Sequence, residues 1–269
     1  MAERIDLHTD RPHPARVYDY LLGGKDNFAA DREAAHRGLR ANPDSRIPPR
    51  ENRLFLRRAV RFLSERGIDQ FLDIGTGIPS APNVHHVAQG VDPGARVVYV
   101  DNDPIVLAHA RALLTGDSRG RTSYLGADLR DVEAILGSAT VRDTLDLGRP
   151  VGLLLIAVLH FIGDEDDPWG VVERLLAALP PGSYLALSHL TGDFRPEAWE
   201  QVTEVYRRQG VTMKVRSRPE IERFLTGLEP VDPGLCVLPA WRPELGEPGD
   251  QPAPSDGQVS VYGAVARKP

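Results

Sequence analysis

The sequence lacks the residues and patterns of several protein classes. Its 269 residues include one cysteine, Cys236, which excludes an intrachain disulfide and a cysteine-rich metal site. The longest apolar run, Val151 to Leu159, is too short to cross a bilayer. The first residues, Met1 to Asp6, lack the apolar core of a signal peptide. We therefore predict a cytoplasmic protein with no membrane partner.

An excess of positive charge is also missing. The 32 lysines and arginines are outnumbered by 38 aspartates and glutamates, which leaves a formal net charge of −6. A general nucleic-acid binder usually shows a basic face, so we predict no nucleic-acid partner. The chain is 41% hydrophobic and 26% charged, which is ordinary for a globular protein. Its length suits one large α/β domain with an added segment.

Strand and helix patterns alternate from Gln70 onward, and the first of them ends in a glycine turn at Gly75 and Gly77. Strands are expected at 70–74, 96–101, 122–125, 152–158 and 183–188. Helices are expected at 83–89, 104–114, 131–137, 169–179, 196–209 and 218–226. Such alternation predicts a parallel sheet with helices on both faces. The last two expected strands, 235–238 and 258–266, have no helix between them and predict an antiparallel hairpin at one edge.

The residues before the first strand predict a separate helical unit. A polar arm, residues 1–16, precedes two expected helices at 28–40 and 50–65. We predict that residues 1–66 form this arm and a helical lid, and that residues 67–269 form the main domain. In the second helix, periodicity places Leu54 with the apolar residues and Arg58 away from them.

Three strand ends carry residues suited to a nucleotide-like ligand. Glycines such as Gly75 and Gly77 let a ligand approach the backbone closely. Asp101 ends the second strand, where a carboxylate can accept hydrogen bonds from ribose hydroxyls. Asp128 and Leu129 follow the third strand, where they can bind an adenine edge. Each signal alone also fits a plain turn or a helix cap, but three in order at strand ends favour a ligand crevice.

The glycine turn distinguishes among nucleotide-like ligands. It reads Gly-x-Gly-x-x-Ser, without the third glycine of a dinucleotide-binding loop. The missing glycine and the terminal strand pair both argue against an NAD(P)-dependent oxidoreductase, which remains an alternative.

Residues 70–190 resemble a class I methyltransferase that uses S-adenosylmethionine (SAM). The whole chain, including residues 15–28 and 83–88, resembles an actinobacterial family of SAM-dependent methyltransferases of unknown substrate. The resemblance implies a Rossmann-like, doubly wound α/β sheet of seven strands in the order 3-2-1-4-5-7-6, with strand 7 antiparallel. It implies SAM as the cofactor and S-adenosylhomocysteine (SAH) as the product. We predict no metal, because the adjacent His85 and His86 point apart on their helix and no cysteine or third spaced ligand supports them. The implied cofactor contacts are Gly75, Thr76 and Gly77 at the methionine part, Asp101 at the ribose, Asn102, Asp128 and Leu129 at the adenine, and Ala157 and Val158 at the sulfonium.

His160 follows the fourth strand in a segment similar to the His-x-x-x-Asp-Glu element of small-molecule O-methyltransferases. In those enzymes the histidine is the general base, because imidazole can take a hydroxyl proton near neutral pH. The alternative is a histidine without a catalytic role. No Asn/Asp-Pro-Pro-Tyr element follows this strand, which disfavours methylation of nucleobase amino groups.

The segment from Tyr18 to Phe28 is a polar and aromatic cluster with twin glycines. One interpretation places Tyr18, Gly23 and Asn27 over the cofactor; the other has them only pack the lid helices. Trp199, with the aromatic residues Trp169, Phe194 and Trp241, either lines an acceptor pocket or belongs to the core.

These observations predict SAM-dependent methyl transfer to a small-molecule acceptor, with O-methylation favoured and His160 as the base. A non-catalytic SAM-binding regulator is the main alternative. The sequence leaves the oligomeric state open between a monomer and a homodimer.

Overall fold

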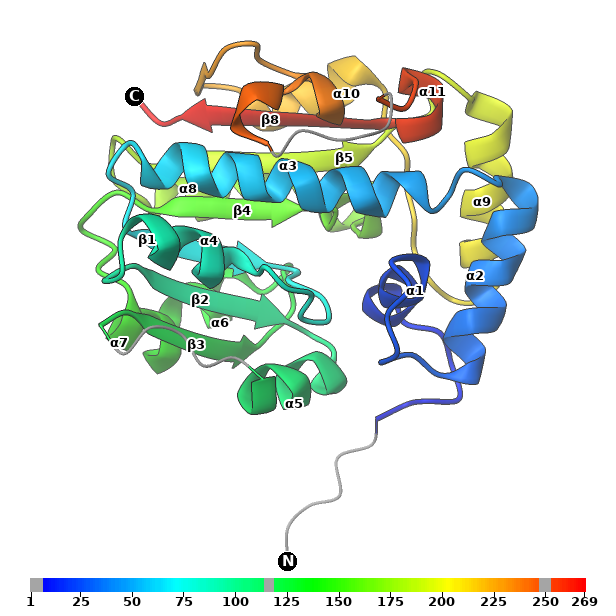
Figure 1. The fold of residues 1–269 in the computed structure, drawn as a ribbon, viewed down its shortest axis with the longest axis horizontal. Helices are drawn as coiled ribbons and strands as arrows, with labels where there is room; N and C mark the ends of the chain where they lie inside the picture. Colours follow the sequence, from blue (N-terminus) through cyan, green and yellow to red (C-terminus); the bar gives the residue numbers. More distant parts are fainter. Residues whose placement is uncertain (1–6, 114–118, 247–252) are drawn as a thin grey trace, which may run out of the picture.

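A computed structural model describes residues 7–113, 119–246 and 253–269 (Figure 1). The start of the predicted arm, residues 1–6, and the predicted helix end at residue 114 lie outside this part. The strands are β1 (Gln70–Ile74), β2 (Arg96–Asp101), β3 (Arg121–Gly126), β4 (Gly152–Ile156), β5 (Tyr184–Leu190), β6 (Glu229–Pro230), β7 (Cys236–Val237) and β8 (Val261–Arg267). The helices are α1 (Pro14–Leu21), α2 (Ala29–Ala41), α3 (Ile47–Ser64), α4 (Val84–Val91), α5 (Pro104–Leu113), α6 (Val132–Gly137), α7 (Ala139–Thr144), α8 (Pro168–Ala177), α9 (Pro196–Arg207), α10 (Arg218–Glu222) and α11 (Asp256–Val259).

The described strands form one mixed sheet in the order β3-β2-β1-β4-β5-β8-β6, with β7 also paired to β8. The five strands β1 to β5 run parallel, and β8 is antiparallel to β5. β8 takes the place of the predicted strand 7, while β6 and β7 share the edge position of the predicted strand 6. The predicted strand order and the antiparallel edge are confirmed.

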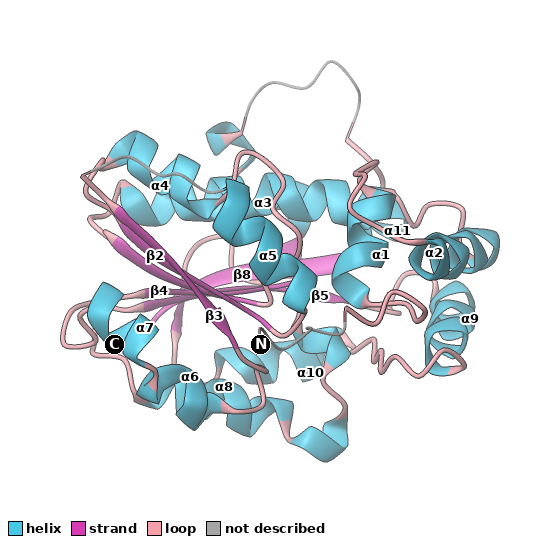
Figure 2. Cartoon of the chain, turned by 90° about the horizontal axis from the view of Figure 1, so that it is seen from below, coloured by secondary structure: helices cyan, strands magenta, loops and turns pink. Residues whose placement is uncertain are grey.

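Helices cover both faces of the sheet, as a parallel sheet requires. Figure 2 shows α3, α4 and α5 on one face and α6, α7, α8 and α10 on the other. α1, α2 and α9 lie together beyond the carboxyl ends of the parallel strands (Figure 1). No described helix combines the length and the apolar character needed to cross a bilayer.

α3, the helix directly before β1, packs on the sheet. Phe55 and Phe62 are buried in the core against the indole of Trp241, with ring centroids 5.3 and 5.6 Å apart. The periodicity misplaced two residues: Leu54 is 41% exposed, and Arg58 is buried. Arg58 donates from Nε to Trp241 O (2.8 Å) and from Nη2 to Leu238 O (2.7 Å), contacts from a distant segment that helix periodicity cannot reveal. The division of the chain at residue 66 stays a prediction.

Several strand bounds differ from the prediction, and the differences at β4 and β8 lie beside the site. β4 ends at Ile156 instead of 158, because Ala157 takes a left-handed backbone conformation (φ 54°). β8 begins at Val261 instead of 258, because residues 256–259 form α11. The expected strand 235–238 shortens to the two residues of β7, since Leu238 begins a 3-10 turn.

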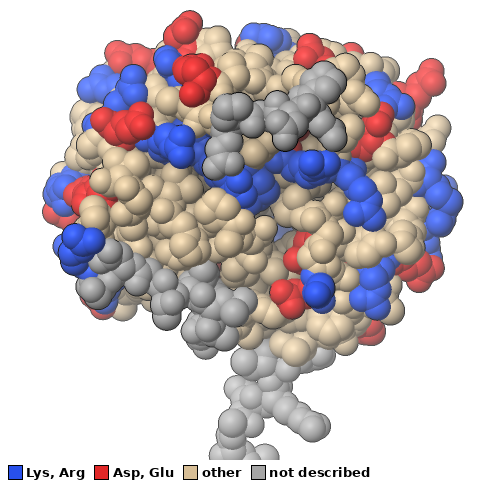
Figure 3. All heavy atoms as spheres, in the orientation of Figure 1, with Lys and Arg blue, Asp and Glu red and all other residues tan. Residues whose placement is uncertain are grey.

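Arginines on the outer side of α3 form a visible row of basic side chains (Figure 3). Two of them contact the loop after the glycine turn. Arg53 Nη2 donates to Ser80 O and Pro82 O, and Arg57 Nη2 donates to Ala81 O (3.5 Å). The row therefore ties the loop after β1 to α3, beside the carboxyl ends of the strands.

Candidate active site

A crevice of about 1850 Å³, measured with its open mouth, lies at the carboxyl ends of β1, β2, β3 and β4. Open α/β sheets bind ligands at this edge. The structure brings most of the predicted cofactor residues together there. The crevice is lined by Gly75, Thr76, Gly77, Asp101, Asn102, Asp128, Leu129, Ala157, Val158 and Tyr18.

The glycine turn needs Gly75 for two reasons. Its φ of +76° lies in the left-handed region, which is unfavourable for residues that carry a Cβ. A Cβ at this position would also lie 2.4 Å from Cγ2 of Val158, so the turn and the end of β4 can approach only because Gly75 has no side chain. Thr76 Oγ1 donates to Asp73 Oδ2 (2.8 Å), which holds the turn against β1. The backbone of residues 75–77 is thereby exposed to the crevice.

Asp101 joins the glycine turn to the end of β2. Its Oδ2 accepts from the N–H of Gly77 (2.8 Å), and its Oδ1 accepts from the N–H of Asp103 (2.9 Å). A carboxylate has about four acceptor positions, so each oxygen keeps one for a ligand. Burial raises the pKa of Asp101 against the lowering effect of these hydrogen bonds. This buried carboxylate is well placed for ribose hydroxyls.

Asp128 is already occupied by protein partners. Its Oδ1 accepts from the backbone N–H (3.0 Å) and Nε (2.8 Å) of Arg130, and its Oδ2 accepts from Arg130 Nη2 (2.7 Å) and Asn102 Nδ2 (2.9 Å). The hydrogen bonds from Arg130 lower its pKa to about 2, against the effect of burial. An adenine amino group would have to displace Arg130 or Asn102 to reach this carboxylate.

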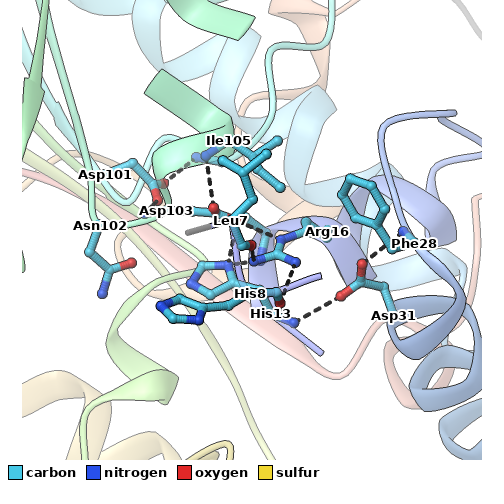
Figure 4. A network of polar contacts seen from close by, with 12 residues as sticks. Leu7, His8, His13, Arg16, Phe28, Asp31, Asp101, Asn102, Asp103 and Ile105 are labelled. Carbon is cyan, nitrogen blue, oxygen red and sulfur yellow. Dashed lines mark hydrogen bonds and ion pairs between the residues drawn. The ribbon is translucent and has the colours of Figure 1, made fainter. Parts of the chain in front are cut away.

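The N-terminal arm forms one wall of the crevice and is latched to the end of β2 (Figure 4). Asp103 Oδ2 accepts from Arg16 Nε (2.8 Å) and lies 3.1 Å from His13 Nδ1. Arg16 also donates to Leu7 O and His8 O, both at 3.2 Å, so one guanidinium holds the arm and the strand end together. Burial would raise the pKa of Asp103, but His13 and Arg16 outweigh it and lower the value to about 2. The latch carboxylate is therefore ionised at neutral pH.

Gly23 and Asn27 do not line the crevice, in contrast to Tyr18. Asn27 Nδ2 donates to Asp19 Oδ2 (2.8 Å) and to Gly24 O (3.1 Å), and a Cβ on Gly24 would lie 2.0 Å from Asp19 Oδ1. The twin glycines thus fold a turn around the Asp19 carboxylate. We do not include Gly23 and Asn27 in the proposed cofactor site.

A second, apolar cavity adjoins the crevice and measures about 650 Å³ when its opening to solvent is included. It lies among α1, α2, α3, α9 and the end of β4, and the two cavities share Pro14, Tyr18, Asn52, Ala157 and Phe161. Trp199 lines this cavity, whereas Trp241 is a core residue beside Phe55 and Phe62, and the partly buried Trp169 stacks on Phe224.

A chain of hydrogen bonds forms the wall between the two cavities. The N–H of Ala157 donates to Ser188 Oγ (2.9 Å), and Ser188 Oγ donates to Asn52 Oδ1. Asn52 Nδ2 donates to Tyr18 Oη (3.0 Å), which in turn donates to Pro49 O (3.0 Å). These hydrogen bonds link the end of β4, β5, α3 and α1. Because the Tyr18 hydroxyl both donates and accepts within it, we assign Tyr18 to positioning instead of proton transfer.

His160 lies in the wall of the apolar cavity, in the short 3-10 helix Leu159–Phe161. It is buried, and its Nδ1 has no hydrogen-bond partner in the described structure. Burial, reinforced by His189 and Arg216, lowers its pKa well below the ordinary value. The ring is therefore neutral at physiological pH.

Arg216 holds the loop that carries His160. The buried guanidinium donates to Leu159 O (3.1 Å) and Ile162 O (2.9 Å), and to Asp164 Oδ1 (2.8 Å). Its Nη1 also lies 2.9 Å from His189 Nε2. The acidic part of the His-x-x-x-Asp-Glu element thus binds Arg216, which fixes the position of His160.

Several site residues were not predicted from the sequence. Arg53 and Asn52 of α3 line the crevice, and Ser188 of β5 supports its wall. An arginine within a row of arginines is indistinguishable from a solvated helix face, which hid Arg53. Asn52 offered one usable signal, because it is a short polar residue close to the apolar positions of its helix.

Metal ligands are not grouped in the described ranges. No cluster of three or more histidine, cysteine, aspartate or glutamate side chains that could hold an ion occurs there.

Solved structures with the same architecture place the sheet and crevice in a Rossmann-like methyltransferase fold. A DUF574 family protein from Streptomyces avermitilis is 47% identical with a TM-score of 0.94, over 98% of this chain and 100% of that chain. A protein from Thermobifida fusca with a provisional methyltransferase assignment is 42% identical with a TM-score of 0.87, over 97% of each chain. TnmH, at 19% identity and a TM-score of 0.52 over 98% of this chain and 66% of that chain, shares the fold.

The family model described as S-adenosyl methyltransferase matches residues 1–269. The chain belongs to this family. A search of curated proteins found no match.

The latch between the arm and β2 yields a stability prediction. Removing one partner of a buried ion pair leaves an uncompensated charge, so Arg16→Met should lower the free energy of unfolding by about 3 kcal/mol. The double variant Arg16→Met/Asp103→Asn should lose less free energy of unfolding than the sum of the losses in the two single variants, because each single change removes the same contact. Urea unfolding measures all three variants.

The matched control is Arg195→Met, which breaks the more exposed pair between Arg195 and Asp44. It should cost less than about 1 kcal/mol. Equal losses in the two arginine variants, or additive effects in the double variant, would contradict the latch.

Proposed function

We propose that this protein binds SAM in the crevice and transfers its methyl group to a hydroxyl of a small molecule held in the apolar cavity. The observation that carries the proposal is the shared wall. A polar crevice suited to a nucleoside and an apolar cavity suited to an acceptor meet at Ala157, Tyr18 and Asn52. The family to which the chain belongs supports the choice of SAM.

The cofactor assignment follows the crevice from β3 to β1. Asn102 and Leu129 border the adenine, and Asp101 accepts from the ribose hydroxyls through its two free acceptor positions. The turn from Gly75 to Gly77 holds the methionine part. Ala157 and Val158 lie beside the sulfur, at the wall to the apolar cavity. We expect Asp128 to contribute only if Asn102 or Arg130 releases it.

Arg53 is the proposed partner of the methionine carboxylate. Its Nη2 is held by Ser80 O and by Pro82 O (2.9 Å), and its Nε has no hydrogen-bond partner in the described structure. The residue lines the crevice beside Gly75 and Thr76. A guanidinium whose Nη2 is fixed and whose buried Nε is unpaired suits a carboxylate, for which charge-assisted hydrogen bonds are strong.

The Arg53 assignment predicts a selective loss of affinity. Arg53→Met should weaken SAH binding by roughly tenfold to a hundredfold, since a hydrogen bond to a charged group contributes about 1.5–3 kcal/mol. Binding of 5′-methylthioadenosine, which lacks the carboxylate, should not change. Calorimetry with both ligands measures the difference, and Arg57→Met on the same helix is the control. Equal losses for the two ligands, or none for either, would refute the assignment.

The transfer itself needs alignment and the exclusion of water more than it needs reactive side chains. Bound SAM supplies a methyl group on a positively charged sulfur. The acceptor oxygen would form the new bond to the methyl carbon as the carbon–sulfur bond breaks. The electron pair of the broken bond would stay on sulfur. The hydroxyl proton passes to the neutral imidazole of His160. Because burial disfavours the charged imidazole, His160 is a weak base that suits an acidic hydroxyl.

The base assignment predicts how activity depends on His160 and on pH. His160→Gln should lower kcat by at least about 10²-fold, the usual contribution of a general base, and leave the Kd for SAH unchanged. The wild-type rate should stay level from pH 8 to pH 6, because the pKa of His160 lies well below 6.5. Release of labelled methyl groups to a panel of hydroxyl acceptors measures both.

Unchanged turnover in His160→Gln would exclude the base. A wild-type protein that binds SAH but methylates no member of the panel would instead support the non-catalytic regulator. The two outcomes are distinct, because the first requires turnover and the second requires its absence.

A further inference from the structure

The apolar cavity contains no acidic, lysine or arginine side chain in its described lining. Its polar lining residues are Ser45, Asn52, Trp199, whose indole N–H has no partner in the described structure, and the titratable Tyr18, Tyr206 and His160. Ser45 Oγ already donates to Asn42 O (2.7 Å), and Asn52 and Tyr18 bond within the wall chain. The cavity therefore offers few groups that could bind a charged ligand.

The titratable residues of the cavity are uncharged at neutral pH. Burial raises the pKa of Tyr206 and of Tyr18 above the ordinary tyrosine value. Burial lowers the pKa of His160, and so do the buried His189 and the Arg216 guanidinium behind it. Asp164 is the acidic residue nearest to His160 in sequence. Its carboxylate already forms ion pairs with Arg216 and with Lys214 Nζ (2.9 Å). A ligand in the cavity thus faces no counter-charge.

A charged acceptor would lose its hydration there without gaining a partner, which is costly. An aliphatic amine is protonated near neutral pH, and a carboxylic acid is ionised. Four aromatic side chains line the cavity together with aliphatic ones, namely Tyr18, Phe161, Trp199 and Tyr206. Aromatic ligands gain both apolar burial and ring contacts from such surroundings.

We propose that the acceptor is an uncharged aromatic molecule, and that the cavity between α9 and the end of β4 rejects ammonium and carboxylate acceptors. This inference rests on the proposed function, in which the cavity holds the acceptor. It narrows the acceptor from any small hydroxyl compound to neutral aromatic ones.

Three naphthalene probes of equal ring size test the proposal at pH 7.5. They are 2-naphthol, 2-naphthoate and 2-naphthylmethylammonium, which are neutral, negative and positive. Saturation-transfer NMR titrations with SAH-saturated protein give their affinities. The neutral probe should bind at least tenfold more tightly than either charged probe, a difference of about 1.4 kcal/mol.

Val202→Trp locates the binding site. Val202 is a buried residue of α9 that lines the cavity, so a tryptophan there should fill the space and reduce 2-naphthol binding at least tenfold. Glu200→Trp on the exposed side of the same helix is the matched control and should bind 2-naphthol like the wild type. SAH affinity is measured in every sample, and its retention shows that Val202→Trp is folded.

Three outcomes would overturn the inference. They are a charged probe that binds as tightly as 2-naphthol, no 2-naphthol binding to SAH-saturated protein, and unchanged 2-naphthol binding in Val202→Trp. Failure to bind SAH would instead refute the proposed function, so the two failures are distinguishable.

Discussion

The hydroxyl of Ser188 connects the parts of the molecule that must meet for methyl transfer. It accepts from the backbone of Ala157 at the end of β4 and donates to Asn52 of α3, which in turn holds Tyr18 of α1. Ala157 has a left-handed backbone, a conformation that costs about 1–2 kcal/mol outside glycine. The hydrogen bond to Ser188 helps to hold this conformation. The sharp turn ends β4 early and opens the sheet edge where the crevice and the apolar cavity share a wall.

The two cavities differ in charge, and the difference suits two different ligands. On the crevice side, Asp73 and Asp101 are buried carboxylates, and burial raises the pKa of Asp73 to about 6 despite the hydrogen bond from Thr76. Buried acids with raised pKa values favour a positively charged ligand, which would relieve their desolvation. The described lining of the apolar cavity contains no such carboxylate. This difference supports the proposal that SAM, with its sulfonium and ammonium charges, binds in the crevice and that a neutral acceptor binds in the cavity.

The sequence was sufficient for the sheet and for the glycine turn because both depend on local patterns. The strand at 70–74 and the acid at Asp101 follow from apolar runs and turn residues that are close in the chain, whereas the order of the strands was implied by the family resemblance. Gly75 was predicted to face a ligand, and the structure adds that it also makes room for Val158, 83 positions later in the sequence.

Side-chain contacts, some of them between distant parts of the sequence, account for what the sequence missed. Arg58 is buried because two carbonyl groups about 180 residues away accept its hydrogen bonds. Asn27 bonds to Asp19 instead of lining the crevice, and Asp128 is occupied by Arg130 and Asn102. Arg53 belongs to the crevice only because α3 packs beside the loop after β1. None of these arrangements has a signature in residue spacing.

The crystal structure of the protein with SAH tests the central claim most directly. We predict that the ribose hydroxyls of SAH lie within hydrogen-bond distance of Asp101 and that its carboxylate lies against Arg53. We also predict that its sulfur lies beside Ala157, at the wall to the apolar cavity. SAH bound elsewhere, or with its sulfur turned away from Ala157, would contradict the account.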